Sequence, residues 1–307
     1  MKRSLVVTGL SVTIFCFFLF SGLSAAREMN VLETSEVTVL FDDRLESAAR
    51  QTAALYPELV DELEESIGWR LQEPCTVALI NDRTAFRSMA GMDYVAAVAV
   101  PSRRLVVVDY TRAAVRPFSF RTILKHELCH LLLHGHIDSE RLPRWLDEGI
   151  AQWTSDGMAE IAMKRDRFLV PRAAVTGNII PLRRLDRGFP RTEKGALLAY
   201  EMSKNIIDYI IREYGPETPA EILENLRRGN DIDEALQTVI LVPLDELERR
   251  WHADLRGGGS WISFWAYHLY EILFVAAALL SAAAFLRYLK RRRDYSRFDD
   301  GDDGTDY

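Results

Sequence analysis

The sequence predicts an α+β fold with a small mixed sheet, two central helices, an α-helical C-terminal lobe and a C-terminal transmembrane helix. Short β-rich runs alternate with helical periodicity in the first half, and the pattern after residue 195 is helical throughout. A long apolar segment near the C-terminus reaches the length needed to span a bilayer. With 307 residues, 48% of them hydrophobic, the chain is long enough to bury a sizeable core.

The elements are justified in chain order by periodicity and by the residues that end them. The first half is expected to contain strands at 37–41 and 75–80, helices at 45–67 and around Phe86, and a hairpin of 95–100 and 105–109. The rest is expected to contain helices at 119–134, 143–155, 196–214, 219–228, 232–239 and 244–255. Leu55, Leu59 and Leu63 share one face of the first long helix, and Gly215 and Gly229 separate helices in the second half.

The N-terminus has the order of a secretory signal. Lys2 and Arg3 precede an apolar stretch, and small residues follow as far as Ala26. We therefore expect residues 1–26 to form a signal peptide; an uncleaved anchor is the alternative, because the apolar run is long for a signal. Either form would export the residues that follow.

The apolar segment at 262–286 is expected to cross the membrane, after a Gly-rich linker at 257–261. Five Lys and Arg residues follow within 287–293, so the positive-inside rule places the tail, 287–307, in the cytoplasm. The expected location is thus the inner membrane, with a periplasmic (extracytoplasmic) domain at 36–256. An apolar core helix is the alternative interpretation of the segment.

Charge and cysteine content exclude other classes of protein. The net charge is −7 and no basic face is evident, which argues against a nucleic-acid partner. The three Cys residues form no disulfide framework, although a single Cys75–Cys129 bridge stays open. No feature of the sequence indicates an oligomeric state.

The chemistry-bearing segment is H-E-x-x-H, at residues 126–130. On a helix, residues four apart share a face, so His126 and His130 project side by side and can hold one metal ion. Glu127 lies one position round the helix, where it can reach a metal-bound water. The pattern therefore predicts two zinc ligands and a general base.

A second segment, at residues 142–151, supplies the expected third ligand, Glu148. Two His and one Glu are a common ligand set for catalytic Zn²⁺, with a fourth position left for water. The loop before this segment is long enough to turn the chain back antiparallel. The small residue Gly149 would allow the two metal-bearing helices to approach closely, and Asp147 is the competing carboxylate.

These residues resemble the gluzincin metallopeptidases, and most of all the bacterial peptidase MA-like domains of that clan. The resemblance covers about 36–256 and includes the P-R-W-L-D-E-G-I-A block at 143–151 and the later block 199–203. It implies a zincin-like fold and a zinc-dependent peptidase acting on polypeptides. It also implies Tyr200 as the donor that stabilises the oxyanion, with a packed core Tyr as the alternative.

In this clan the first hairpin strand commonly pairs with extended substrate, so 95–100 is expected at the sheet edge; a buried strand is the alternative.

Two other function classes share parts of this pattern. A site-2-type intramembrane protease would carry its motif in an apolar span, but Arg121, Lys125 and Glu127 interrupt this helix, so we reject it. A non-catalytic zincin-fold binding or assembly module of the cell envelope stays open.

Overall fold

The computed structural model describes residues 29–71, 74–90, 95–115, 119–155, 169–257, 269 and 273–289. The predicted signal peptide, 1–26, lies outside this part, as do 258–261 of the linker and 290–307 of the tail. Contacts divide the chain into two units, Met1–Ala253 and Asp254–Tyr307. Each unit is described by itself.

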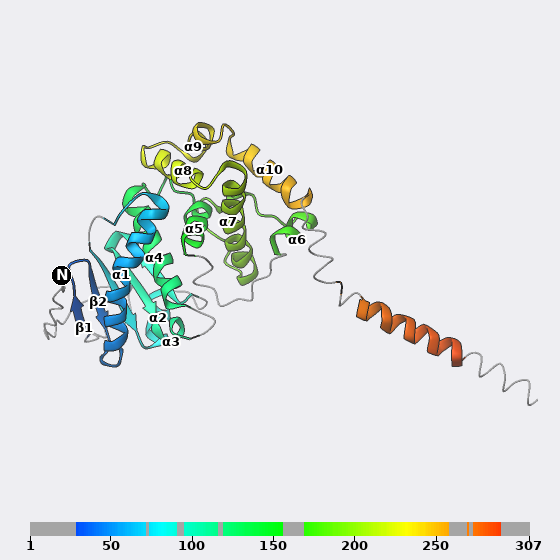
Figure 1. Ribbon diagram of the computed structural model, residues 1–307, viewed down its shortest axis with the longest axis horizontal. Helices are drawn as coiled ribbons and strands as arrows, with labels where there is room; N and C mark the ends of the chain where they lie inside the picture. Colours follow the sequence, from blue (N-terminus) through cyan, green and yellow to red (C-terminus); the bar gives the residue numbers. More distant parts are fainter. Residues whose placement is uncertain are drawn as a thin grey trace, which may run out of the picture. The chain divides into compact units, whose positions relative to one another are not determined.

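Five strands form one mixed sheet, in the order β1-β2-β3-β5-β4. Figure 1 labels β1 and β2 at one end of this order. The strands are β1 (Asn30–Glu33), β2 (Val37–Phe41), β3 (Cys75–Ile80), β4 (Ala97–Val100) and β5 (Leu105–Asp109). The central three are parallel, and the edge strands β1 and β4 are antiparallel to their neighbours. The predicted small mixed sheet is confirmed, but the sequence does not predict β1, because it is short and only half apolar.

Helices make up most of the remaining described chain. The first half contains α1 (Glu46–Ile67), α2 (Arg83–Ala90), α3 (Tyr110–Ala113), α4 (Phe120–His136) and α5 (Arg144–Thr154). The second contains α6 (Leu169–Thr176), α7 (Glu193–Tyr214), α8 (Thr218–Arg227), α9 (Ile232–Val239) and α10 (Leu244–Gly257). The long helices agree with the predicted ones to within a few residues. The short helices α3 and α6 are additional to the predicted elements.

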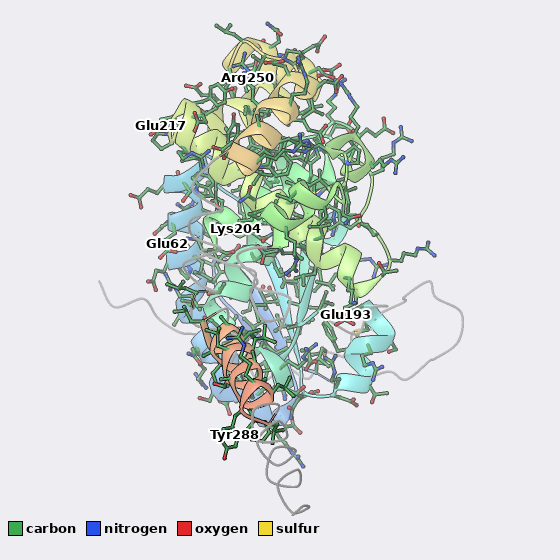
Figure 2. All side chains as sticks on the ribbon, turned by 90° about the vertical axis from the view of Figure 1, so that its right-hand side faces the viewer. Glu62, Glu193, Lys204, Glu217, Arg250 and Tyr288 are labelled. Carbon is green, nitrogen blue, oxygen red and sulfur yellow. The ribbon has the colours of Figure 1, made fainter. Side chains whose placement is uncertain are left out.

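Helices α1 and α4 pack on the sheet and on each other. Leu59 and Leu63 of α1 are completely buried or nearly so, as the predicted apolar face requires. At the rim of this contact lies Glu62 of α1, which is labelled in Figure 2. Its carboxylate forms ion pairs with two residues of α4, with Lys125 at 2.8 Å and with Arg121. Helix α4 also packs against β4 and β5.

Helix α5 is held mainly by α7. Gly149 lies against the α7 backbone, and a Cβ at this position would stand 2.5 Å from the carbonyl oxygen of Ser203. The expected close approach is between the two metal-bearing helices; the structure places it between α5 and α7 instead. Gln152 adds a buried hydrogen bond from its Nε2 to the backbone oxygen of Tyr200, at 3.1 Å. The α-helical lobe thus sets the position of α5.

In the second unit, residues 273–289 are helical and their side chains are exposed. The exposed large apolar side chains are Leu273, Phe274, Val275, Leu279, Leu280, Phe285, Leu286, Tyr288 and Leu289. Among the residues that the structure describes, no helix combines the length and apolarity needed to cross a membrane. Residues 262–268 and 270–272 of the predicted span lie outside that part of the chain.

Candidate metal centre

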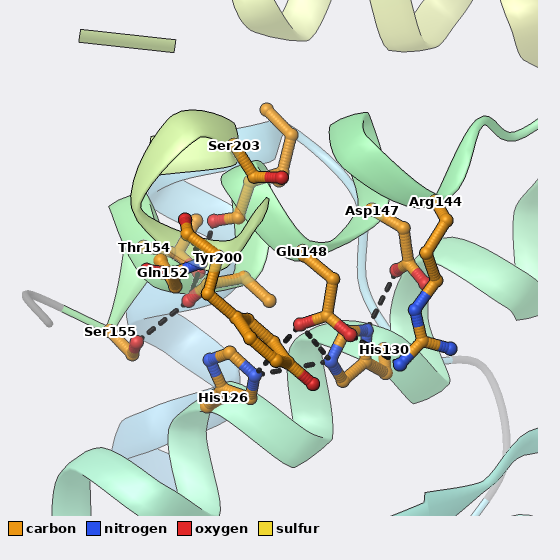
Figure 3. A network of polar contacts seen from close by, with 12 residues as sticks. His126, His130, Arg144, Asp147, Glu148, Gln152, Thr154, Ser155, Tyr200 and Ser203 are labelled. Carbon is orange, nitrogen blue, oxygen red and sulfur yellow. Dashed lines mark hydrogen bonds and ion pairs between the residues drawn. The ribbon is translucent and has the colours of Figure 1, made fainter. Parts of the chain in front are cut away.

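Three buried side chains bring their donor atoms together between α4 and α5 (Figure 3). The Nε2 atoms of His126 and His130 are 3.2 Å apart. Glu148 Oε2 lies 3.6 Å from each of these nitrogens. The ligand set predicted from the sequence is therefore assembled, with all three donor atoms within 4.8 Å of one another.

The spacing of these donors fits a zinc ion. Zinc bound tetrahedrally at about 2.0–2.1 Å holds neighbouring donor atoms about 3.3 Å apart. The observed separations, 3.2 Å and twice 3.6 Å, lie close to that value. At 3.6 Å the carboxylate makes no hydrogen bond to either imidazole, although Glu148 is fully buried. A buried carboxylate facing two imidazole nitrogens in this way is suited to a shared cation.

Local sequence explains how α4 presents its two histidines. Ser119 caps the helix by accepting a hydrogen bond from the backbone N–H of Thr122, at 3.4 Å. The apolar residues around the motif are buried: Ile123, Leu124, Leu128, Leu131, Leu132 and Leu133. The helix continues to His136, so the turn to α5 is shorter than expected, and His136 is helical rather than in the loop. Pro143 then precedes the first residue of α5.

Asp147, the competing carboxylate, faces away from the donor cluster and bonds to histidine rings. Its Oδ1 lies 2.7 Å from His130 Nδ1, and its Oδ2 lies 3.1 Å from His134 Nε2. Burial alone would lower the pKa of His130, but the carboxylates of Asp147 and Glu148 outweigh it and raise this pKa well above its ordinary value. Asp147 therefore contacts the rings of His130 and His134, which leaves Glu148 as the third member of the cluster.

Arg144 is a site residue that the sequence prediction missed, and it contacts the opposite side of Glu148. Its Nη2 lies 2.5 Å from Glu148 Oε1, one helical turn further along α5. Burial would raise the pKa of Glu148, but Arg144 and His130 hold it well below its usual range. The i,i+4 spacing of Arg144 and Glu148 is the feature of the sequence that indicates this ion pair. The pair leaves Oε2 as the oxygen that faces the histidines.

The two residues with predicted catalytic roles are both buried, and one of them, Tyr200, is seen to face the cluster. Glu127 is 1% exposed and follows His126 directly on α4. Tyr200 of α7 is 5% exposed, and its ring packs edge-on against Phe189 at 4.9 Å between centroids. In Figure 3 the Tyr200 ring points toward His126, His130 and Glu148. Both expected roles stay predictions.

The two cysteines that the structure describes are not members of the donor cluster. Cys75 and Cys129 are both free and buried, so the disulfide left open by the sequence does not form. Burial raises the pKa of Cys129 to about 12. The thiol therefore stays protonated at neutral pH and acts as a small apolar side chain of α4.

The predicted edge strand is confirmed in its second part. Strand β4 covers Ala97–Val100 and forms the end of the sheet beyond β5. It packs against α4, the helix that carries both histidines. Among the residues that the structure describes, no strand pairs with the side of β4 that faces away from β5.

Comparison with known proteins gives one family and several distant structures. The family model for the peptidase MA superfamily matches residues 57–257. A variant of the M1 zinc metallopeptidase from Deinococcus radiodurans is 13% identical, with a TM-score of 0.43 over 74% of this chain and 49% of that one. Legionella pneumophila aminopeptidase A in complex with aspartic acid is 14% identical, with a TM-score of 0.44 over 74% of this chain and 26% of that one. The chain thus spans half or less of the length of these two, and no curated protein matches it.

Proposed function

The chain belongs to the peptidase MA superfamily, and from this premise we propose that it is a membrane-tethered zinc peptidase. Its substrates would be exported or membrane-proximal proteins, whose peptide bonds it hydrolyses. The observation that carries the proposal is the near-tetrahedral spacing of His126, His130 and Glu148. These three residues would hold the ion.

Each residue of the site has a chemical task in this proposal. Bound zinc lowers the pKa of a coordinated water to about 7 and polarises the scissile carbonyl. The Glu127 carboxylate accepts a proton from the attacking water and then delivers it to the leaving amine. The Tyr200 hydroxyl donates a hydrogen bond to the oxyanion of the transition state.

Strand β4 suits a polypeptide substrate. Its outer edge has no partner strand among the described residues, so it can pair with an extended chain through main-chain hydrogen bonds. Ala99 is small and partly exposed, so it leaves room for substrate side chains. Because α4 packs on this strand, a peptide bound there would pass close to the histidines.

The exposed apolar helix at 273–289 supports the membrane tether. A helix with this many exposed large apolar side chains is uncommon on a soluble protein and is typical of a contact with lipid or another protein. The basic residues at 287–293 would keep the tail in the cytoplasm, and the signal-like N-terminus would export the catalytic unit. The peptidase would then act outside the inner membrane.

The competing function is a non-catalytic binding or assembly module that keeps the fold. The two are separated with the full chain purified in detergent, by zinc analysis and by cleavage of an unfolded protein substrate. A peptidase should hold one zinc and cleave; Glu127→Gln should keep the zinc and lose turnover, whereas His126→Ala should lose both. Zinc binding without cleavage would favour the binding module, and the absence of zinc uptake would refute the zinc site.

A further inference from the structure

His134 forms the outer part of a hydrogen-bonded chain that ends at the metal ligand His130. Asp147 joins the two rings: its Oδ1 lies 2.7 Å from His130 Nδ1 and its Oδ2 lies 3.1 Å from His134 Nε2. Asp147 is 2% exposed. We propose that His134 is a positioning residue that holds Asp147, and through it His130, in the orientation needed for zinc. This inference rests on the proposed zinc peptidase.

The chemistry of the four groups gives the chain one direction. An ionised carboxylate only accepts hydrogen bonds, so both ring nitrogens that face Asp147 must carry protons. With its proton on Nδ1, His130 presents the Nε2 lone pair to the metal. His134, protonated at Nε2, can accept at Nδ1 from Ser139 Oγ, which lies 3.0 Å away. Every donor and acceptor in this series of hydrogen bonds is then matched once the Nε2 lone pair of His130 faces a metal ion.

Loss of His134 would therefore act on the metal through Asp147. The buried Oδ2 would lose its imidazole donor, and leaving a buried charged acceptor without its partner is unfavourable. The carboxylate would turn toward other donors and hold His130 less firmly. Partners of metal ligands change affinity by about 10–100-fold, and His134 stands one step further out, so we expect about a tenfold loss.

His136 offers a matched control on the same helix. It is the last residue of α4, stacks on Trp69 at 5.0 Å between ring centroids and bonds to the backbone oxygen of Leu132. A loss of helix-end packing would accompany substitution at either position. Of His134 and His136, His134 is the one that bonds to Asp147, so substitution of His134 alone should change zinc affinity.

The test measures the zinc dissociation constant of the full chain by competition with a chromophoric chelator. His134→Ala should weaken zinc binding about tenfold, whereas His134→Gln, whose amide can donate to Asp147, should restore most of the affinity. The matched His136→Ala and His136→Gln variants should bind zinc like the wild type. Turnover of His134→Ala should recover when zinc is raised to saturation.

Wild-type affinity in His134→Ala, or an equal loss in His136→Ala, would overturn the proposal. If His134→Ala fails to fold, Ser139→Ala decides the question. This variant removes the hydroxyl donor to His134, and it should weaken zinc binding about two- to threefold. An unchanged zinc affinity would refute the proposed series of hydrogen bonds from Ser139 to His130. If the wild type binds no zinc, the proposed function fails first, and that result is distinct from all of these.

Discussion

The backbone of Gly149 lies so close to α7 that a Cβ at this position would stand 2.5 Å from the carbonyl oxygen of Ser203. The same Cβ would stand 2.7 Å from Ile207 Cγ1. A backbone oxygen cannot move aside as a flexible side chain can. Because Gly149 follows Glu148 directly, the contact between α5 and α7 also determines how far the third ligand reaches toward α4.

Gly149→Ala should therefore destabilise the fold and weaken zinc binding together. Overpacking of this kind costs about 1–3 kcal/mol. Gly135→Ala is the matched control, since Gly135 is also helical and a Cβ there would meet nothing within 4 Å. It should be neutral or stabilise by up to about 1 kcal/mol, because Ala favours helix more than Gly. Chemical unfolding and zinc titration of both variants would show this, and equal effects would contradict it.

The sequence is sufficient to predict the parts of the site that local geometry determines. His126 and His130 share a face because the helical repeat places residues four apart together. The choice of Glu148 over Asp147 depends on the rotation of α5 about its axis. That rotation is determined by packing on α7, more than forty residues further along the chain, so the spacing within α5 cannot establish it.

Other features escape prediction for related reasons. The signal for β1 is weak because Asn30 and Glu33 flank only two apolar residues, and its strand forms by pairing with β2. The link from His134 to Asp147 joins two helices, so spacing along one helix does not indicate it. The ion pair of Arg144 with Glu148 has a spacing that indicates it, but many such pairs are simply solvated.

Glu148→Ala should reduce zinc affinity far more than Asp147→Ala. The first change removes a ligand, and the second removes only the partner of His130, which is worth about 10–100-fold in affinity. Competition with a chelator measures both constants on one scale. A larger loss in Asp147→Ala would make Asp147 the ligand and reverse the assignment.

Tyr200→Phe should lower turnover without lowering zinc affinity. Loss of one oxyanion donor costs about 10²–10³ in kcat, while the ring itself, packed on Phe189, is kept. Tyr209→Phe is a control on the same helix, because Tyr209 is similarly buried. Steady-state cleavage of a peptide by both variants decides the matter. Wild-type turnover in Tyr200→Phe would leave Tyr200 as a packed core residue.

The proposed membrane orientation predicts a specific reporter pattern. A reporter that is active only in the cytoplasm should be active when fused after Tyr307 and silent when fused after Arg256. The charge asymmetry supports this, since five Lys and Arg residues lie within 287–293, directly after the apolar segment. The opposite pattern would place the catalytic unit in the cytoplasm and change the class of substrate.

Zinc uptake at neutral pH should release a proton from the site. The carboxylates of Asp147 and Glu148 outweigh burial and raise the pKa of His130 well above its ordinary value, so this ring is protonated in the metal-free protein at pH 7. The stability gained from its charge is fully present below the unfolded pKa of about 6.5 and is lost as pH rises through the raised folded value. A metal ligand must be neutral imidazole, so zinc has to displace the proton.

Calorimetry in two buffers with different heats of ionisation would count this proton. We expect the apparent binding enthalpy to differ between buffers in proportion to roughly one to one and a half protons released per zinc at pH 7, because the His130 proton leaves and a coordinated water with a pKa of about 7 is half ionised. Zinc affinity should increase as pH rises toward the folded pKa of His130 and then level off, because the proton no longer competes above it. Asp147→Asn should reduce the release, since it removes the nearest charge that raises this pKa. A binding enthalpy that is the same in both buffers would show that the ring is already neutral.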